Sequence, residues 1–277
     1  MGAIDISSPS DPERLRRSGR FLQRSAATWF AAAAAGQLAF IWMILAHYGR
    51  KTLAGNPAGW NDKPLIKGFV PGYESGNAMF AAHVLLAAVL TFAGLMQLLP
   101  AIRRRAPSLH RRSGRLFLIF SGLASLGGLW LTWGRHTYLS PISAIAVSLD
   151  GVLILIFAAL AWRYALQRDY AAHRRWALRA FLVVSGVWFL RIGIMAWVLL
   201  SGGGLGMNRT LSGPADIVLQ FGAYLVPLAI LEIYLHAQQG ASASARFRAG
   251  ALLFLSALLT LVGTGGAIAF MWGPYMT

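Results

Sequence analysis

Long apolar runs separated by short polar breaks form the dominant pattern of the chain. Stretches without a charged side chain, at 25–49, 75–102 and 249–277, each exceed the roughly 20 residues that a helix needs to cross the hydrocarbon core of a bilayer. The breaks between the runs are rich in arginine, proline and glycine. The pattern predicts an all-α bundle of about seven membrane-spanning helices, at 27–47, 77–99, 116–134, 142–165, 180–200, 216–236 and 249–272.

An odd number of spans places the two ends of the chain on opposite sides of the membrane. Residues 1–24 are polar and basic, and we expect them to form a disordered tail in the cytoplasm. Residues 25–277 are expected to form a single membrane domain, because no stretch between the spans is long enough for a soluble domain. Within that domain, residues 77–236 are the expected functional core.

The composition argues against a soluble enzyme. Of the 277 residues, 57% are hydrophobic and 12% are charged, whereas soluble domains have about 45–50% apolar and about 25% charged residues. The chain has no cysteine, which excludes disulfides, iron–sulfur clusters and thiolate zinc sites. All three lysines lie outside the predicted spans, which excludes a retinal Schiff base, and neither an H-E-x-x-H metal helix nor a phosphate-binding P-loop is present. The sequence assigns no catalytic residue.

The net charge of +16 is explained by membrane topology and not by binding to nucleic acid. Most of the 25 lysines and arginines fall on the same side as the amino terminus, counting Arg163 at the inner end of its span, and only Arg191 lies deep within a predicted span. Because positive residues accumulate in cytoplasmic loops, this asymmetry predicts a cytoplasmic amino terminus. The lipid bilayer is therefore the principal expected partner.

Two of the basic connections resemble each other. His110-Arg111-Arg112 leads into Ser121-Gly122 on the next predicted span, and His173-Arg174-Arg175 leads into Ser185-Gly186. The match requires one single-residue gap. It is consistent with two duplicated helical hairpins, and equally with the general tendency of cytoplasmic loops to be basic.

These same residues carry a resemblance to a known family. An H-R-x-x-G-R motif lies at 110–115 and a D-x-x-x-H-R-R-W-x-x-R segment at 169–179, followed by Leu190-Arg191 and Leu231-Glu232. The chain resembles, over roughly 77–236, a family of bacterial predicted membrane proteins that carry a domain of unknown function. The resemblance implies a multi-pass protein of the bacterial inner membrane and no agreed activity.

Three charged residues, Asp150, Arg191 and Glu232, fall inside the predicted spans and away from their ends. A basic side chain at the centre of a bilayer costs about 2.5–3.5 kcal/mol on insertion scales, so Arg191 requires a partner or a wet cavity. Asp150 lies at a similar depth on the preceding antiparallel span, and we expect the two to pair. Glu232 lies near the inner end of its span, where it reaches Arg191 only over a long distance or faces the cytoplasmic arginines. Asp150 and Arg191 then form either a relay or substrate clamp, or a structural ion pair.

The six histidines divide into an outer and an inner set of three. A b-type haem requires two neutral imidazoles at matched depth, with cations nearby for the propionates. The predicted haem iron ligands are His83 with His136 (or His47) outside and His110 with His173 inside, and the predicted propionate-binding cations include Arg111 and Arg174. This arrangement loosely resembles the diheme transmembrane cytochromes b, which implies electron transfer across the membrane and a quinone or another membrane redox partner.

A different class of function uses the same residues. Arg111 and Arg174, with their neighbouring arginines and histidines, could equally form an anion pocket for a lipid headgroup or phosphate. In that case the protein is a non-enzymatic binding or transport protein, with Asp150, Arg191 and Glu232 lining a polar cavity, or it is a structural or assembly factor. Small residues of the last span, Gly263, Gly265 and Gly266, permit tight helix contact within the bundle or in a homodimer.

Overall fold

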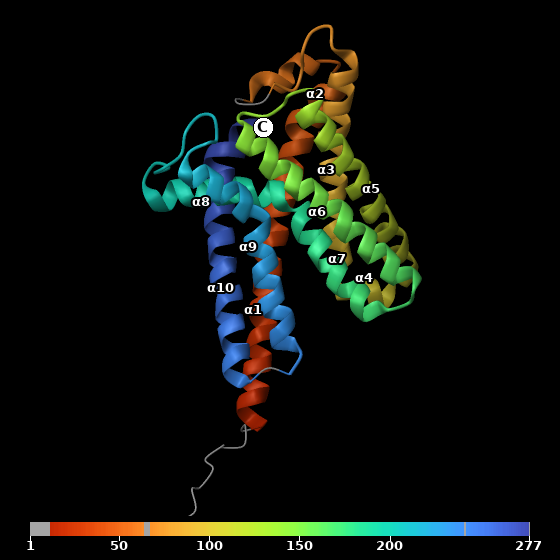
Figure 1. Cartoon of the computed structure of the whole chain (residues 1–277), viewed down its shortest axis with the longest axis vertical. Helices are drawn as coiled ribbons and strands as arrows, with labels where there is room; N and C mark the ends of the chain where they lie inside the picture. Colours follow the sequence, from red (N-terminus) through yellow and green to blue (C-terminus); the bar gives the residue numbers. More distant parts are fainter. Residues whose placement is uncertain (1–11, 64–66, 241, 277) are drawn as a thin grey trace, which may run out of the picture.

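The computed structural model describes residues 12–63, 67–240 and 242–276 (Figure 1). This part of the chain is almost wholly helical and contains no strand, as the sequence predicts. The long helices are α1 (Pro12–Ile44), α3 (Glu74–Leu98), α5 (Pro107–Trp133), α6 (Pro141–Leu166), α7 (Tyr170–Val184), α8 (Gly186–Ser201), α9 (Pro214–Gln238) and α10 (Ala243–Gly266). Short helices are α2 (Arg50–Leu53) and α4 (Pro100–Arg105), π-helical turns at Leu45–Gly49 and Ala267–Trp272, and 3₁₀ turns at Pro57–Asp62 and Gly273–Tyr275.

The number of membrane-spanning helices agrees with the prediction. Six helices in the described part of the chain are long and apolar enough to cross a membrane, and α7 with α8 makes a seventh if the pair is one span. Several begin at a proline, which suits the first helical turn because its missing N–H would have no partner there. The chain enters α1 at one end of the bundle and reaches its carboxyl terminus at the other (Figure 1).

The predicted span at 180–200 is not a continuous helix. α7 and α8 meet at an angle of 54°, with Ser185 between them. The Ser185 Oγ donates to the carbonyl oxygen of Phe181 at 2.8 Å, and Gly186 follows directly. A serine–glycine pair is a common cause of a sharp kink, because both residues weaken the regular backbone hydrogen bonding.

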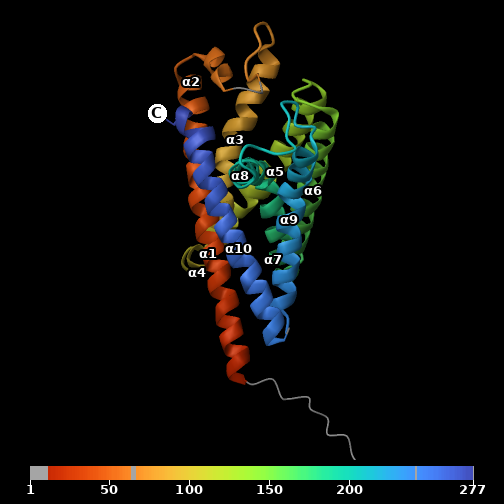
Figure 2. The ribbon, with the colours of Figure 1, turned by 90° about the vertical axis from the view of Figure 1, so that its left-hand side faces the viewer.

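α1 is longer than the sequence predicts. Residues 12–24, which we expected in a disordered tail, are helical, whereas residues 1–11 lie outside the described residues. Leu22 is buried against Ala249 and Leu253 of α10, so this first part of α1 has an apolar contact that the composition alone does not reveal. α1 and α10 lie side by side along the bundle (Figures 1 and 2).

The glycines of the last span serve packing within the bundle. Gly263 lies directly against the backbone of Ile192 in α8, and a Cβ at Gly266 would lie 2.8 Å from Leu199 of the same helix. Gly265, by contrast, has no neighbour within 4 Å of a Cβ position. Close contact between α8 and α10 therefore accounts for two of the three glycines.

The connection between α1 and α3 folds back onto one end of the bundle. Lys51 Nζ donates to the carbonyl oxygen of Gly59 at 2.7 Å and to Asp62 Oδ2 at 2.5 Å. Trp60 is buried, with its ring 6.0 Å from that of Phe80. These contacts order the described part of the connection.

Candidate functional site

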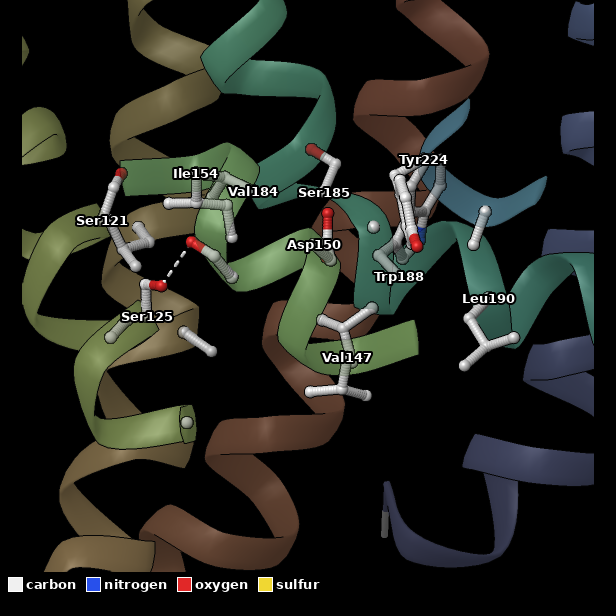
Figure 3. A pocket seen from close by; sticks show the side chains of 18 of the residues that line it. Ser121, Ser125, Val147, Asp150, Ile154, Val184, Ser185, Trp188, Leu190 and Tyr224 are labelled. Carbon is white, nitrogen blue, oxygen red and sulfur yellow. Dashed lines mark hydrogen bonds between the residues drawn. The ribbon is translucent and has the colours of Figure 1, made fainter. Parts of the chain in front are cut away.

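A cavity of about 190 Å³ with several polar side chains in a mostly apolar lining lies among the membrane-spanning helices, at the break between α7 and α8 (Figure 3). Six elements line it, namely α1, α3, α5, α6, α9 and the α7–α8 junction. Its polar lining residues are Gln37, His83, Thr91, Ser121, Ser125, Asp150, Ser185, Trp188, Gln220 and Tyr224. We refer to it as the Asp150 cavity.

Asp150 is the acidic residue of this cavity. Its carboxyl group points from α6 toward the first residues of α8 (Figure 3). A Cβ at Gly186 would lie 2.6 Å from Asp150 Oδ2, so the glycine is what leaves room for the carboxyl group. The amino-terminal end of α8 carries a partial positive charge, which offsets only part of the cost of burying a negative charge at this position.

Five polar atoms around the cavity are buried and have no hydrogen-bond partner in the described part of the chain: Gln37 Oε1, His83 Nδ1, Asp150 Oδ1, Trp188 Nε1 and Tyr224 OH. They come from five different helices and converge on one space. Leaving such a group unsatisfied costs about 1–3 kcal/mol each, and more for a charged one. The cavity therefore has the unused donors and acceptors that a polar ligand requires.

The serine hydroxyl groups of the cavity already form hydrogen bonds with the protein. Ser121 Oγ donates to the Phe117 carbonyl oxygen at 2.6 Å, and Ser125 Oγ donates to the Gly151 carbonyl oxygen at 2.7 Å, which joins α5 to α6 (Figure 3). Gln37 Nε2 donates to Ser185 Oγ at 3.0 Å, which joins α1 to the helix break. These bonds position the walls and leave the carboxyl, indole and phenol groups for a ligand.

The internal sequence repeat has a structural counterpart here. Ser121 and Ser185 occupy equivalent positions in the repeat, both line the cavity, and each donates to the carbonyl oxygen four residues earlier. The preceding phenylalanines, Phe117 and Phe181, both pack on Gly94 of α3, where a Cβ would lie 3.1 and 3.0 Å from their rings. The two halves of the repeat therefore meet at the same helix.

The predicted ion pair between Asp150 and Arg191 is absent from the described residues. Arg191 Nη1 instead donates to the Val187 carbonyl oxygen at 2.9 Å, and its guanidinium lies 5.4 Å from the centroid of the Phe40 ring. The break at Ser185 turns the helix axis, so two residues at equal predicted depth do not face each other. Only Asp150 of the three intramembrane charges lines the cavity.

Glu232 pairs at the other end of the bundle. Its Oε1 and Oε2 accept from Arg179 Nε and Nη2 at 2.7 and 2.8 Å. The Arg179 guanidinium also lies 4.5 Å from the centroid of the Trp176 ring. This agrees with the alternative in which Glu232 faces the arginine-rich side, and it corrects the alternative in which it reaches Arg191.

The predicted outer histidines have separate surroundings. His83 lines the Asp150 cavity and packs against α5, where a Cβ at Gly128 would lie 3.1 Å from its Cε1. His136 lies in the α5–α6 connection with a φ of 54°, and its ring is 6.0 Å from that of Tyr138. His47 is buried, with its ring 4.6 Å from that of Tyr48.

The predicted inner residues lie at the starts of α5 and α7. His173 Nδ1 is 2.8 Å from the Ala161 carbonyl oxygen, and His110 lies within electrostatic range of His173. Arg174 and Arg111 are both exposed, and Arg174 also contacts Gln238 Oε1 of α9. No group of three His, Asp or Glu residues in the described ranges could hold a metal ion. Haem ligation by His83, His136, His110 and His173 stays a prediction.

Most residues of this site carry no signal in the sequence. Gln37, Trp188 and Tyr224 each lie within an apolar run, where aromatic and amide side chains give no periodic signal. The one available signal was Ser185-Gly186, because that pair predicts a kink and kinks within membrane helices expose backbone and side-chain polar groups to a cavity.

Comparison with protein families places most of the cavity in a defined segment. Residues 80–235 match the family model described as "Predicted membrane protein (DUF2306)". The chain belongs to this family. The match includes α5 to α8 and therefore Asp150, the helix break and the unpaired groups of α8 and α9, but not Gln37 of α1. Comparison with curated proteins and with solved structures finds no match.

Proposed function

We propose that this membrane protein binds a small organic cation in the Asp150 cavity, as a binding or transport protein. The observation that carries the proposal is the Asp150 carboxyl group, which has no cationic partner in the described residues and lies among unpaired hydrogen-bonding groups. A carboxylate buried among membrane helices is costly unless a cation or a proton neutralises it.

The neighbouring aromatic residues fit the same ligand class. Trp188 and Tyr224 are almost fully buried and face the cavity near Asp150 (Figure 3). An ammonium group is attracted to the face of an aromatic ring, most strongly to that of tryptophan. Tyr224 OH and Trp188 Nε1 are also available to donate hydrogen bonds to an oxygen atom elsewhere on the ligand.

The size of the cavity limits the ligand. Its volume of about 190 Å³ is below the range of roughly 300–1,000 Å³ typical of pockets for drug-sized molecules. A substituted ammonium ion or a small amino alcohol is small enough for a cavity of this volume. Broken helices within membrane spans also form the substrate sites of many transporters.

The test is thermal unfolding of the detergent-purified protein with a panel of small ammonium ions, from methylammonium to choline, and of neutral alcohols of similar shape. At a ligand concentration of 100 times Kd, we expect about 2.7 kcal/mol of stabilisation by an ammonium ion and none by its neutral match. Asp150→Asn should abolish the effect. Glu232→Gln, which removes a carboxylate outside the cavity, should retain it. Equal effects of ammonium ions and alcohols would refute the proposal.

We also propose, from the arginine asymmetry, that the amino terminus lies in the cytoplasm and that the membrane is the bacterial inner membrane. Haem b-supported electron transfer with a quinone partner, and a homodimer, remain separate predictions from the sequence. No atom of the described chain lies within 4 Å of a Cβ position at Gly265, so this glycine is open to a second copy in such a homodimer.

A further inference from the structure

A second and larger cavity of about 520 Å³ lies between α1 and α10 on one side and α7, α8 and α9 on the other. Its walls are mostly apolar and include aromatic residues such as Trp29, Phe30 and Phe189. Along α9 it extends from Val218 to Tyr234, which corresponds to about 24 Å of helix at 1.5 Å per residue. It is therefore an elongated apolar cleft that follows the bundle axis, and we call it the long cleft.

One charged residue stands at an end of the long cleft. Arg174 is the only ionisable side chain among its described lining residues other than Tyr234, and it lies near the start of α7, at the arginine-rich end of the bundle. Its Nη1 and Nη2 contact Gln238 Oε1 at 3.3 and 3.4 Å, which holds the guanidinium on α9 without neutralising it. Gln238 Nε2 in turn donates to Tyr234 OH at 2.8 Å.

This distribution of polarity matches an anionic amphiphile. An apolar volume parallel to the membrane-spanning helices fits an acyl chain, and a guanidinium at one end fits a phosphate, which it binds with two parallel hydrogen bonds. Basic pockets between membrane helices bind the headgroups of anionic lipids in the same way. Arg174 is exposed at this end of the cleft, so a headgroup outside the cleft can reach it, and an anionic headgroup supplies the counter-ion that a neutral one lacks.

We propose that the long cleft binds one acyl chain of an anionic phospholipid, with the headgroup phosphate on Arg174. The proposal does not depend on the Asp150 cavity, which has different walls except for Ala223 at their boundary. The sequence predicts an anion pocket that includes Arg111 and Arg174. Of these two arginines only Arg174 lines the long cleft, so the proposal assigns the phosphate to Arg174.

Three glycines allow matched leucine variants, two that fill the long cleft and one outside it. Gly222 lines the cleft, and a Cβ there would meet only Val226 of its own helix at 3.7 Å, so Gly222→Leu fills the cleft without a backbone clash. Gly193→Leu fills it from α8, where the nearest atom is Leu219 Cδ2 at 3.7 Å. Gly265→Leu adds the same side chain where no atom lies within 4 Å of the Cβ position, and serves as the control.

The experiment is native mass spectrometry of the full chain titrated with phosphatidylglycerol or phosphatidylcholine of identical acyl chains. The expected preference of the wild-type protein for phosphatidylglycerol is about fivefold. Arg174→Gln should remove the preference while retaining binding. Gly222→Leu or Gly193→Leu should remove one bound lipid of either kind, and Gly265→Leu should remove none; thermal unfolding confirms that each variant is folded.

Three outcomes would overturn the proposal. The first is an unchanged preference for phosphatidylglycerol in Arg174→Gln. The second is wild-type lipid binding in folded Gly222→Leu and Gly193→Leu. The third is competition by glycerol phosphate as effective as that by the intact lipid, which would assign Arg174 to a soluble phosphate ligand and leave the cleft without an acyl chain.

Discussion

The carboxyl group of Asp150 lies so close to Gly186 that a larger residue at position 186 would have to displace it. A Cβ there would lie 2.6, 3.2 and 3.3 Å from the three carboxyl atoms of Asp150. The contact joins α6 to the first residue of α8 and fixes the acid at the helix break. The serine–glycine pair that kinks the span thus also creates the space for the charge.

Gly186→Ala should therefore displace Asp150 and destabilise the protein by about 1–3 kcal/mol, the usual cost of overpacking. The matched control is Gly122→Ala at the equivalent position of the repeat, where the nearest atom to a Cβ is Leu155 Cδ2 at 4.0 Å. Thermal or denaturant unfolding measures both. Similar losses in the two variants would mean that Asp150 does not depend on the space at Gly186.

The charge partners can be tested by double-mutant cycles. Glu232→Gln and Arg179→Met should show a coupling of about 0.5 kcal/mol, because Glu232 is half exposed and screening weakens the pair. Asp150→Asn and Arg191→Met should be additive in the free energy of unfolding, since no contact joins the two side chains. A coupling between Asp150 and Arg191 as large as that between Glu232 and Arg179 would show that the ion pair expected from the sequence forms.

Because of Lys63, the free energy of unfolding of the protein should increase as the pH rises above about 8. Burial, with a smaller contribution from the charge of Arg191, lowers the pKa of Lys63 from 10.5 to about 8. Between pH 8 and 10.5 the unfolded chain binds this proton and the folded chain does not, so the free energy of unfolding increases with pH over that window. The same rise in a Lys63→Met variant would show that another group is responsible.

The predicted haem ligands are tested by the reduced-minus-oxidised absorbance spectrum of the purified protein. If His110 and His173 bind a haem, alanine at either position should remove the absorbance of the inner haem and leave that of His83 and His136. A colourless protein from haem-replete cells would end this prediction. That result would leave the proposed cation site in the Asp150 cavity unaffected, because cation binding there requires no haem.

The sequence predicts the helices well and the site only in part. Long apolar runs identify each span, because every long helix must present an apolar surface to lipid. Counting residues from the span ends also gave a depth for Asp150 and Arg191. Depth alone does not determine which way a side chain faces, and the break at Ser185 redirects α8, so Arg191 lies over Phe40 and not beside Asp150.

The cavity itself depends on contacts between distant parts of the chain. Gln37 and Ser185 are hydrogen-bonded across 148 residues, and Tyr224 reaches the same space from α9. Nothing in an apolar run distinguishes a tryptophan such as Trp188 that faces a cavity from one that faces lipid. Likewise, the helical start of α1 depends on burial of Leu22 against α10, and its arginine-rich composition suggested only a mobile tail.

Binding of a small organic cation by Asp150 is tested most directly by equilibrium dialysis of the purified chain against the radiolabelled ammonium ion that stabilises it most. We predict one saturable site per chain, lost in Asp150→Asn and kept in Glu232→Gln. Saturable binding of equal affinity in wild-type protein and Asp150→Asn, or no saturable binding in the wild type, would contradict the assignment of this site to Asp150.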